Sequence, residues 1–394
     1  MSHQDQPVQT SAAPPRSLDH DNYTVAIICP MGDELSPVLA LLDEKYESLS
    51  TSRDQNAYVL GRMGGHNIVV ATMPTIGNNA AAMVVTQLLN DFGRVRFGLL
   101  VGVGGGIPDK DYEDDDLHDI RLGDVVVSKS RENFGGVVQF DRGKSTTSDF
   151  VRTGHLNRPP HILAGNVEKL KAVHNLHGNN IPRFLDEMLA KYPRMKERYS
   201  CPGADWDRLF EAAYTHQGGK SCKNCDNTQV VKRNPHRDSR PRIHYGTIGS
   251  SNMVVENTDS RDELRDSMHA LCVEMEAAGL MEAFPCLVIR GISDYADSHK
   301  NKKWQPYAAA TAAAYAKELL LQIPLEAVKH TQPIIEVVFN MRERVNENPE
   351  RIERRTQSSR ENNMLEGSSP RDIDFSALHD TSQRAYSPAI GYRD

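Results

Sequence analysis

The segment Val-Ile-Arg-Gly-Ile-Ser-Asp at residues 288–294 constrains the fold more than any other part of the chain. A largely apolar run that ends in Ser-Asp predicts a buried strand that presents Asp294 at its carboxyl end, where open α/β sheets bind their ligands. Just upstream, Glu274 and Glu276 stand in an otherwise apolar segment, at the expected start of a helix. Buried carboxylates are costly without a partner or a function, so we expect all three to converge on one pocket. Such a pocket favours binding of sugar hydroxyls together with acid–base chemistry.

Strands and helices alternate along most of the chain. Residues 23–29 form a near-continuous apolar run, as expected of a strand that is covered on both faces. Apolar runs and helical patterns then follow each other, which predicts an α/β fold with a largely parallel or mixed sheet. The expected strands are 23–29, 67–73, 97–103, 124–128, 244–248 and 288–294, and the expected helices are 35–46, 80–89, 161–176 and 307–321.

Three segments fall outside this alternation. Residues 1–21 are rich in Gln, Ser and Pro, and residues 326–394 are polar, so we expect mostly disordered tails, the second with a short helix at 333–345. Residues 178–242 hold three cysteines, two histidines and many basic residues, which indicates an irregular insertion. One folded domain is therefore expected over residues 22–325.

Composition limits the partners of this chain. Its 394 residues carry a net charge of -7, which argues against nucleic acid as the main partner. No apolar run is long enough to span a bilayer, and residues 1–21 lack the apolar core of a signal peptide. Cys29, Cys272 and Cys286 stand in apolar runs and are expected to be buried thiols. These features favour a reducing, cytoplasmic setting and no membrane partner.

Two glycine motifs resemble nucleotide-binding loops but fail on spacing. Gly-Lys-Ser at 143–145 would need a glycine five positions earlier to form a phosphate-binding loop, and that position is Val138. The run Gly-Val-Gly-Gly-Gly at 102–106 would need its last fingerprint glycine at Ile107, and it follows the third expected strand rather than the first. We therefore expect no dinucleotide cofactor, and we expect these glycines to let the backbone approach a ligand closely.

The insertion carries one candidate metal motif. Cys222 and Cys225 could form half of a zinc site, with His216 or His236 as further ligands. A closed structural site needs four ligands, and a single Cys-x-x-Cys is weak evidence, so a metal-free pair remains the alternative and no metal is assigned. The basic residues of the insertion fit either a solvated surface or phosphate binding.

Two segments together resemble the nucleoside phosphorylase/nucleosidase superfamily. They are the glutamate segment at 273–279 and the Arg-Gly-Ile-Ser-Asp segment at 290–294, in this order and about twenty residues apart. The chain is similar to the phosphorylase-like domains common in fungal proteins and to methylthioadenosine/adenosylhomocysteine nucleosidase. The resemblance covers roughly residues 22–321 and implies a three-layer αβα catalytic domain with a central mixed sheet. It also implies a purine nucleoside or nucleotide as substrate, no cofactor and a homo-oligomer.

The resemblance assigns roles to particular residues. Asp294 matches the general acid that protonates the departing purine at N7, with a turn cap as the structural alternative. Glu276 matches the glutamate that binds the ribose hydroxyls, and Met275 the residue that packs under the sugar. Glu34 matches the glutamate that activates water in the hydrolytic branch, with an ordinary helix-start carboxylate as the alternative. The other expected substrate-binding residues are Gly104, Gly105, Asn252, Met253, Ser293 and Arg290, whereas Val254 stands where a stacking aromatic would be expected.

Charge favours hydrolysis over phosphorolysis. Related phosphorylases bind phosphate with cations at positions that correspond here to Ser36, Leu100 and Val103, and a buried dianion without compensating charge is costly. We therefore expect water as the nucleophile. The alternatives are a phosphate-dependent phosphorylase with a rearranged site and a purine-binding sensor module without turnover. The basic insertion and the cluster His299, Lys300, Lys302 and Lys303 also raise the possibility of a nucleotide substrate such as AMP or ATP.

Overall fold

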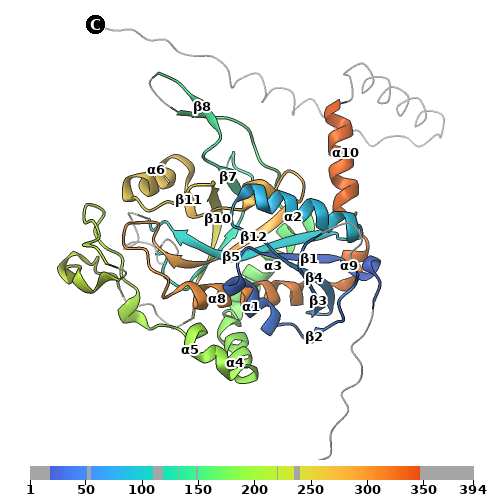
Figure 1. The fold of residues 1–394 in the computed structure, drawn as a ribbon, viewed down its shortest axis with the longest axis horizontal. Coiled ribbons are helices and arrows are strands. Elements are labelled where there is room, and N and C mark those ends of the chain that lie inside the picture. Colours follow the sequence, from blue (N-terminus) through green and yellow to red (C-terminus); the bar gives the residue numbers. More distant parts are fainter. Residues whose placement is uncertain are drawn as a thin grey trace, which may run out of the picture. The chain divides into compact units, whose positions relative to one another are not determined.

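The computed structural model describes residues 18–50, 55–109, 119–131, 133–147, 150–219, 221–234 and 240–346. The described residues up to Phe339 form one compact unit, and the chain divides after Phe339. The first unit is built on a ten-stranded mixed sheet, which confirms the expected α/β class (Figure 1). Across the sheet the strands run β11 (Ala270–Glu274), β10 (Ile243–Ser250), β6 (Val125–Ser128), β12 (Cys286–Asp294), β5 (Phe97–Gly106), β1 (Val25–Cys29), β4 (His66–Thr72), β3 (Tyr58–Met63) and β2 (Glu44–Lys45), and β7 (Val137–Gln139) pairs with β10.

The centre of the sheet is parallel and fully buried. Strands β12, β5, β1 and β4 lie next to one another in parallel, with Ile289 opposite Val101 and Val25 opposite Phe97. All five residues of β1 and all nine of β12 are buried, which explains why both segments are nearly continuous apolar runs. Antiparallel pairs border this parallel centre, because β3, β6 and β11 pair in this way with β4, β12 and β5, respectively. A separate hairpin pairs β8 (Gly143–Ser145) with β9 (Phe150–Arg152).

Helices cover both faces of this sheet. Alternate residues of β1 point to opposite sides, so Val25 and Ile27 belong to one hydrophobic cluster and Ala26 and Ile28 to the other. Figure 1 shows α2 on one side of the sheet and α1, α4 and α8 on the other. The first cluster includes side chains of α1 (Gly32–Ala40), α3 (His161–His177), α4 (Ile181–Lys191), α5 (Lys196–Tyr199), α8 (Gln305–Gln322) and α9 (Leu325–Lys329), and the second includes side chains of α2 (Asn78–Asp91), α7 (Ala277–Leu280) and α10 (Ile334–Asn346).

Helix α8 lies unusually close to the central strand β12. Its alanine-rich sequence is buried along almost its whole length, and small side chains permit this approach. Gly291 of β12 faces the backbone of Ala308, and a Cβ on Gly291 would overlap the Ala308 carbonyl group and lie 3.0 Å from its Cα. The backbone at Gly291 has no positive φ, so the constraint there is space rather than conformation.

We expect Gly291→Ala to lower the free energy of unfolding by about 1–3 kcal/mol, because the added methyl group must push α8 away from β12. Gly165→Ala, in α3, is the matched control: nothing lies within 4 Å of its added Cβ, and alanine should stabilise the helix by about 0.5–1 kcal/mol. Urea titration followed by circular dichroism measures both changes. Equal stabilities of the two variants would contradict the close packing of α8.

The structure contains several elements that the sequence analysis did not predict, among them β2, β7, β11 and the helix Thr258–Met268. Strand β3 was not expected, and the first helix spans Gly32–Ala40 instead of 35–46. Irregular chain was expected over 178–242, but its first part forms α4. The positions Ile181, Phe184, Leu185 and Met188 are buried at the i, i+3, i+4, i+7 spacing of an amphipathic helix, a signal that the polar composition of the segment had masked.

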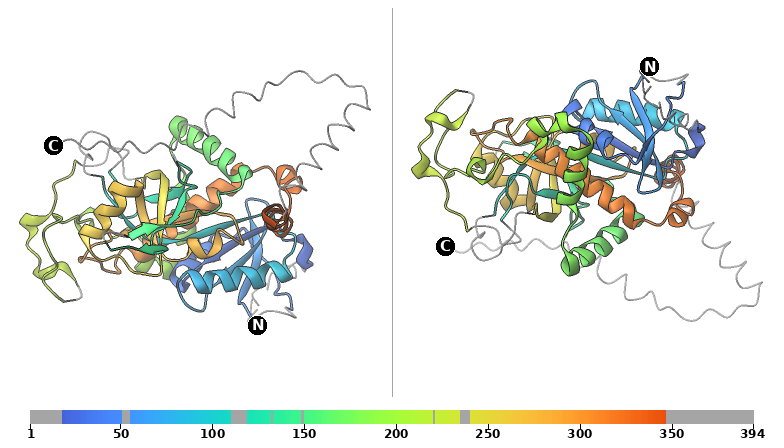
Figure 2. Two further views of the ribbon diagram at one scale, coloured as in Figure 1. Left: turned by 90° about the horizontal axis from the view of Figure 1, so that it is seen from above. Right: turned by 90° about the horizontal axis from the view of Figure 1, so that it is seen from below.

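Residues 201–234, which follow α5, have little regular structure. The described part holds 3₁₀ turns at Ala204–Trp206, Cys222–Asn224 and Asn227–Gln229 and one isolated bridge between Phe210 and Val230. In both views of Figure 2 this yellow-green segment lies at the opposite end of the sheet from the blue strands near the N-terminus. The remaining helix, α6 (Thr258–Met268), precedes β11. Within the described ranges, no helix combines the length and apolarity that crossing a membrane requires.

Candidate active site

A cavity of about 400 Å³ opens at the carboxyl ends of the central strands. Its volume falls in the range of small-molecule sites, and its place in the sheet is where open α/β folds bind ligands. Its lining residues come from the chain after β1, the end of β5, the chain after β10, and the ends of β11 and β12 with the residues that follow them. The lining residues include Met31, Glu34, Ile76, Val103, Gly104, Gly105, Met253, Val254, Val255, Val273, Glu274, Met275, Glu276, Ser293, Asp294, Lys300 and Lys302.

Arg290 lies beneath this cavity and joins its carboxylates. One guanidinium nitrogen, Nη2, donates to Glu276 Oε2 at 2.9 Å and to Glu274 Oε2 in a still shorter contact. The other, Nη1, lies 3.8 Å from Glu34 Oε1. All four side chains are almost completely buried, and the three carboxylates raise the pKa of Arg290, so the guanidinium stays charged. Gly102 of β5 makes room for this cluster, since a Cβ there would overlap both Arg290 and Glu34.

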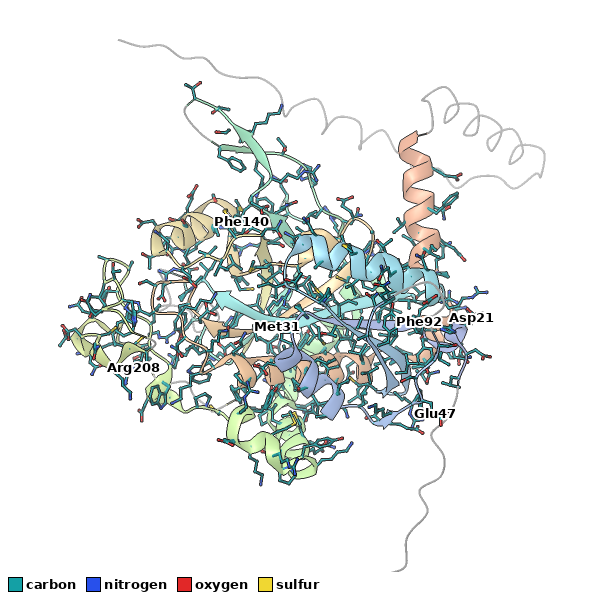
Figure 3. The ribbon with its side chains drawn as sticks, viewed as in Figure 1. Asp21, Met31, Glu47, Phe92, Phe140 and Arg208 are labelled. Carbon is teal, nitrogen blue, oxygen red and sulfur yellow. The ribbon has the colours of Figure 1, made fainter. Side chains whose placement is uncertain are left out.

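Glu34 is held in the first turn of α1 by two backbone donors. Met31 N–H donates to Oε2 and Val103 N–H to Oε1, both at 2.7 Å (Met31 is labelled in Figure 3). The first of these bonds is also the one that caps α1, so the expected helix-start role is real. Burial raises the pKa of Glu34 to about 7, against the opposing effects of Arg290 and the two backbone bonds. The carboxyl group can therefore both release and take up a proton near neutral pH.

Asp294 ends β12 and is 7% exposed. Ser293 Oγ donates to its Oδ2 at 2.9 Å, Ala296 N–H donates to its Oδ1 at 3.1 Å, and Lys300 Nζ lies 3.8 Å from Oδ1. Burial raises the pKa of Asp294, while Lys300 and these hydrogen bonds lower it. The bond from Ala296, whose φ is 52°, shows that Asp294 also caps a turn, although the next helix starts only at Gln305.

Glu276 and Glu274 have different local partners. Glu276 Oε1 accepts from Gly77 N–H at 3.1 Å, and burial is the main cause that raises its pKa. Because each carboxylate oxygen can accept more than one hydrogen bond, Glu276 retains capacity for ligand hydroxyls. Glu274 accepts from the N–H groups of Glu276 and Ala277 at 3.0–3.2 Å, so it caps the turn that precedes α7 while it neutralises Arg290.

Most of the expected substrate-binding residues line the cavity, but two do not. Arg290 is fully buried, and its guanidinium contacts three carboxylates that line the cavity instead of the cavity itself. Asn252 is exposed; its Oδ1 accepts from Asn78 N–H at 3.0 Å, and its own N–H donates to Asp141 Oδ2 at 2.8 Å. A local pattern places a residue after a strand, but only the fold decides whether its side chain turns toward the cavity. The expected residues that do line it are Glu34, Gly104, Gly105, Met253, Met275, Glu276, Ser293 and Asp294.

Of the two basic clusters found in the sequence, the one after Asp294 reaches the cavity, and the described part of the one in the insertion does not. Lys300 and Lys302 line the cavity, whereas no described residue of the insertion does. Arg233 instead binds Asp119 and Asp207 and donates to Tyr295 Oη at 2.6 Å. His236 and Lys220 lie outside the described residues. The wall around Met253 and Val254 is aliphatic, and none of the lining residues among the described ones is aromatic.

Comparisons with known proteins agree with this architecture. The family model of the phosphorylase superfamily matches residues 24–322. A nucleotide-binding leucine-rich repeat (NLR)-like protein of Hyaloscypha variabilis is 42% identical over 323 residues, which are 82% of this chain but 31% of that relative, so the chain spans about a third of its length. A 5'-methylthioadenosine/S-adenosylhomocysteine nucleosidase of Mycobacterium bovis is 24% identical over 77% of this chain and 97% of the relative. ATP nucleosidase Cap17 of Escherichia coli is 22% identical over 64% of this chain and 41% of the relative.

Proposed function

Because this chain belongs to the phosphorylase superfamily, we propose that it hydrolyses the N-glycosidic bond of a purine nucleoside or nucleotide and releases the free base. One observation carries the proposal: two buried carboxyl groups, Glu34 and Asp294, line the same cavity, and burial raises the pKa of both. A pair of this kind supplies a proton donor and a proton acceptor to one substrate. Two of the curated relatives are named as nucleosidases, which supports the same reaction class.

In the proposed reaction, protonated Asp294 gives its proton to N7 of the purine. The bond between C1′ and N9 breaks, its electron pair leaves with the neutral base, and the sugar becomes an oxocarbenium-like cation. Glu276 binds the ribose hydroxyls, with Met275 packed beneath the ring, and so positions C1′. Water then attacks C1′ and loses a proton to Glu34, which leaves ribose or a phosphoribose as the second product.

The charge around Arg290 favours water over phosphate as the nucleophile. Glu34, Glu274 and Glu276 surround this one guanidinium, so its charge is already neutralised. At the positions where related phosphorylases use phosphate-binding side chains, Ser36 donates to Gly32 O at 2.9 Å and Leu100 is buried in the core. A phosphate dianion beside Glu34 would therefore be repelled without compensation.

The substrate class of this proposal includes nucleotides. Lys300 and Lys302 place positive charge on the cavity wall, and the Escherichia coli relative is named an ATP nucleosidase. The deciding experiment incubates the purified chain with adenosine, AMP and ATP, each with and without phosphate, and identifies the products by chromatography. We expect free adenine and ribose or its phosphate esters, at rates independent of added phosphate.

Three results of this experiment would overturn parts of the proposal. Strict phosphate dependence with release of ribose 1-phosphate would assign a phosphorylase. Purine binding by calorimetry without any turnover would assign a binding module. Turnover of adenosine alone would exclude a phosphate-binding role for Lys300 and Lys302.

The pH dependence of kcat/KM should show the ionisation of Glu34. Glu34 must be deprotonated to accept a proton from water, and its pKa is raised to about 7. We therefore expect kcat/KM to rise with pH up to about 7 and to fall about tenfold per pH unit well below it. Initial rates over pH 4–9, with circular dichroism as the check that the fold is intact, measure this. An acidic limb near 4.5, the ordinary value for glutamate, would argue against Glu34 as the base.

A further inference from the structure

The segment 201–234 brings two thiols and an imidazole together away from the cavity. Cys222 and Cys225 bracket a 3₁₀ turn, and both are free thiols. His216 Nδ1 lies 3.2 Å from Cys225 Sγ and 3.9 Å from Cys222 Sγ, and all three candidate ligand atoms lie within 4.8 Å of one another. Zinc with Zn–S bonds of about 2.3 Å and Zn–N bonds of about 2.1 Å sets tetrahedral ligand atoms roughly 3.5–3.8 Å apart. The observed spacings already approach that arrangement.

The surroundings of this cluster supply an independent observation. His299 is 6% exposed, and its Nε2 has no hydrogen-bond partner among the described residues. Its ring stacks on Phe210 with centroids 4.0 Å apart and lies edge-on to the ring of His216 at 5.5 Å. An unpaired buried imidazole nitrogen is costly, and this one belongs to a ring that packs against the His216 ligand, so a polar partner at the cluster would relieve that cost.

The cluster also lies where segment 201–234 meets the loop after β12. His216 N–H donates to Ser298 Oγ at 3.1 Å, and Cys222 Sγ lies 3.7 Å from the carbonyl oxygen of His299. The next residue, Lys300, lines the cavity and lies 3.8 Å from Asp294. In Figure 3, Arg208 shows where segment 201–234 lies, at the opposite end of the view from Phe92, which follows α2.

We propose that Cys222, Cys225 and His216 bind a zinc ion that fastens segment 201–234 to the loop at residues 297–300. Two thiolates and an imidazole at tetrahedral spacing are a donor set that zinc prefers over hard cations. Water completes the four-coordinate site in this arrangement, because the ring nitrogens of His299 do not lie within 4.8 Å of all three other ligand atoms. A segment held by 3₁₀ turns and one isolated bridge gains stability from such a link, because metal binding adds directly to its folding free energy. The sequence alone left this site open between metal and a metal-free pair.

The test measures zinc in the full chain purified from zinc-supplemented cells without a histidine tag. Mass spectrometry of the metal should give about one zinc ion per chain in the parent protein and in the Cys201→Ser control, whose thiol is exposed and outside the cluster. The zinc content of the Cys222→Ser/Cys225→Ser double variant should be at least about tenfold lower than that of the parent protein. Cobalt substitution should give the thiolate-to-cobalt absorption and the intense visible bands of a tetrahedral site in the parent only.

A second measurement uses the unmutated chain, so the test does not depend on folding of a variant. A mercurial reagent that reacts with thiols should release zinc stoichiometrically, and a strong chelator should lower the melting temperature of the parent but leave the double variant unchanged. Zinc at background level in the parent, equal zinc in parent and double variant, or a Cys222–Cys225 disulfide in freshly purified protein would each overturn the proposal. None of these readouts depends on catalytic activity, so their failure leaves the proposed hydrolase standing.

Discussion

Asp294→Asn should lower kcat for an unmodified purine substrate by about 10²–10⁴-fold. Asparagine has the same shape as aspartate and can still accept the hydrogen bond from Ala296 N–H, but its amide group is too weak an acid to transfer a proton to N7. The departing base must then leave as an anion, which is the costly step that the acid avoids. Steady-state rates with the best substrate of the panel measure the loss, and KM should change much less than kcat.

Two controls separate proton donation from a structural role of Asp294. The first control is Asp262→Asn. Asp262 lies in α6 and binds Arg261 and Arg265, so this variant should keep full activity. A purine nucleoside already methylated at N7 needs no proton to leave, so Asp294→Asn should cleave it almost as fast as the parent chain does. An equal loss on methylated and unmethylated substrates would show that Asp294 only shapes the site.

Arg290→Met should lower the free energy of unfolding by about 3–5 kcal/mol. The substitution leaves Glu34, Glu274 and Glu276 buried around an apolar side chain, and the loss of their common partner is costlier than the loss of a surface ion pair. Arg183→Met is the matched control, because Arg183 forms an exposed pair with Glu187 and should cost less than about 0.5 kcal/mol. Denaturant titration at pH 7 compares the two.

The destabilisation by Arg290→Met should depend on pH. Arg290 lowers the pKa of Glu34 and Glu276, so without it burial raises both pKa values further. Carboxyl groups with a raised pKa in the folded state are tolerated while protonated and cost stability as pH rises through that pKa. The stability gap between the variant and the parent should therefore narrow from pH 8 to pH 5. A gap that is constant across this range, or no larger than that of Arg183→Met, would contradict the ion cluster.

The sequence anticipated the central elements well because their signals are local. A strand buried on both faces must be apolar along its length, so the runs that became β1, β5 and β12 could be recognised without a structure. The amphipathic spacing of Ile181, Phe184, Leu185 and Met188 was equally local, yet polar residues between them led to the expectation of irregular chain. Strand β3 is an outer strand in which half of the residues are only partly buried, and this weakens its apolar pattern.

The candidate site, too, was only partly predictable from the sequence. The sequence identified Glu274, Glu276, Arg290 and Asp294 as candidate site residues, but it did not show how their side chains lie relative to one another. Arg290 was expected to contact the substrate. Pairing of β12 with β5 instead sets Arg290 opposite Gly102 and beneath the cavity. From there its guanidinium reaches Glu34, which lies in the first turn of α1. Asn252 turned out to hold the start of α2 instead of lining the cavity.

The sequence by itself determined which residues end the buried strands, and with them the α/β class and the identity of the acidic side chains, because strand burial leaves a pattern within a few neighbouring residues. Only the tertiary structure decided which of those side chains share one guanidinium, that burial raises the pKa of Glu34 to about 7, and that His216 meets Cys222 and Cys225. These properties depend on distances between residues far apart in the chain. Such distances are set by strand register and helix packing, which no local pattern records.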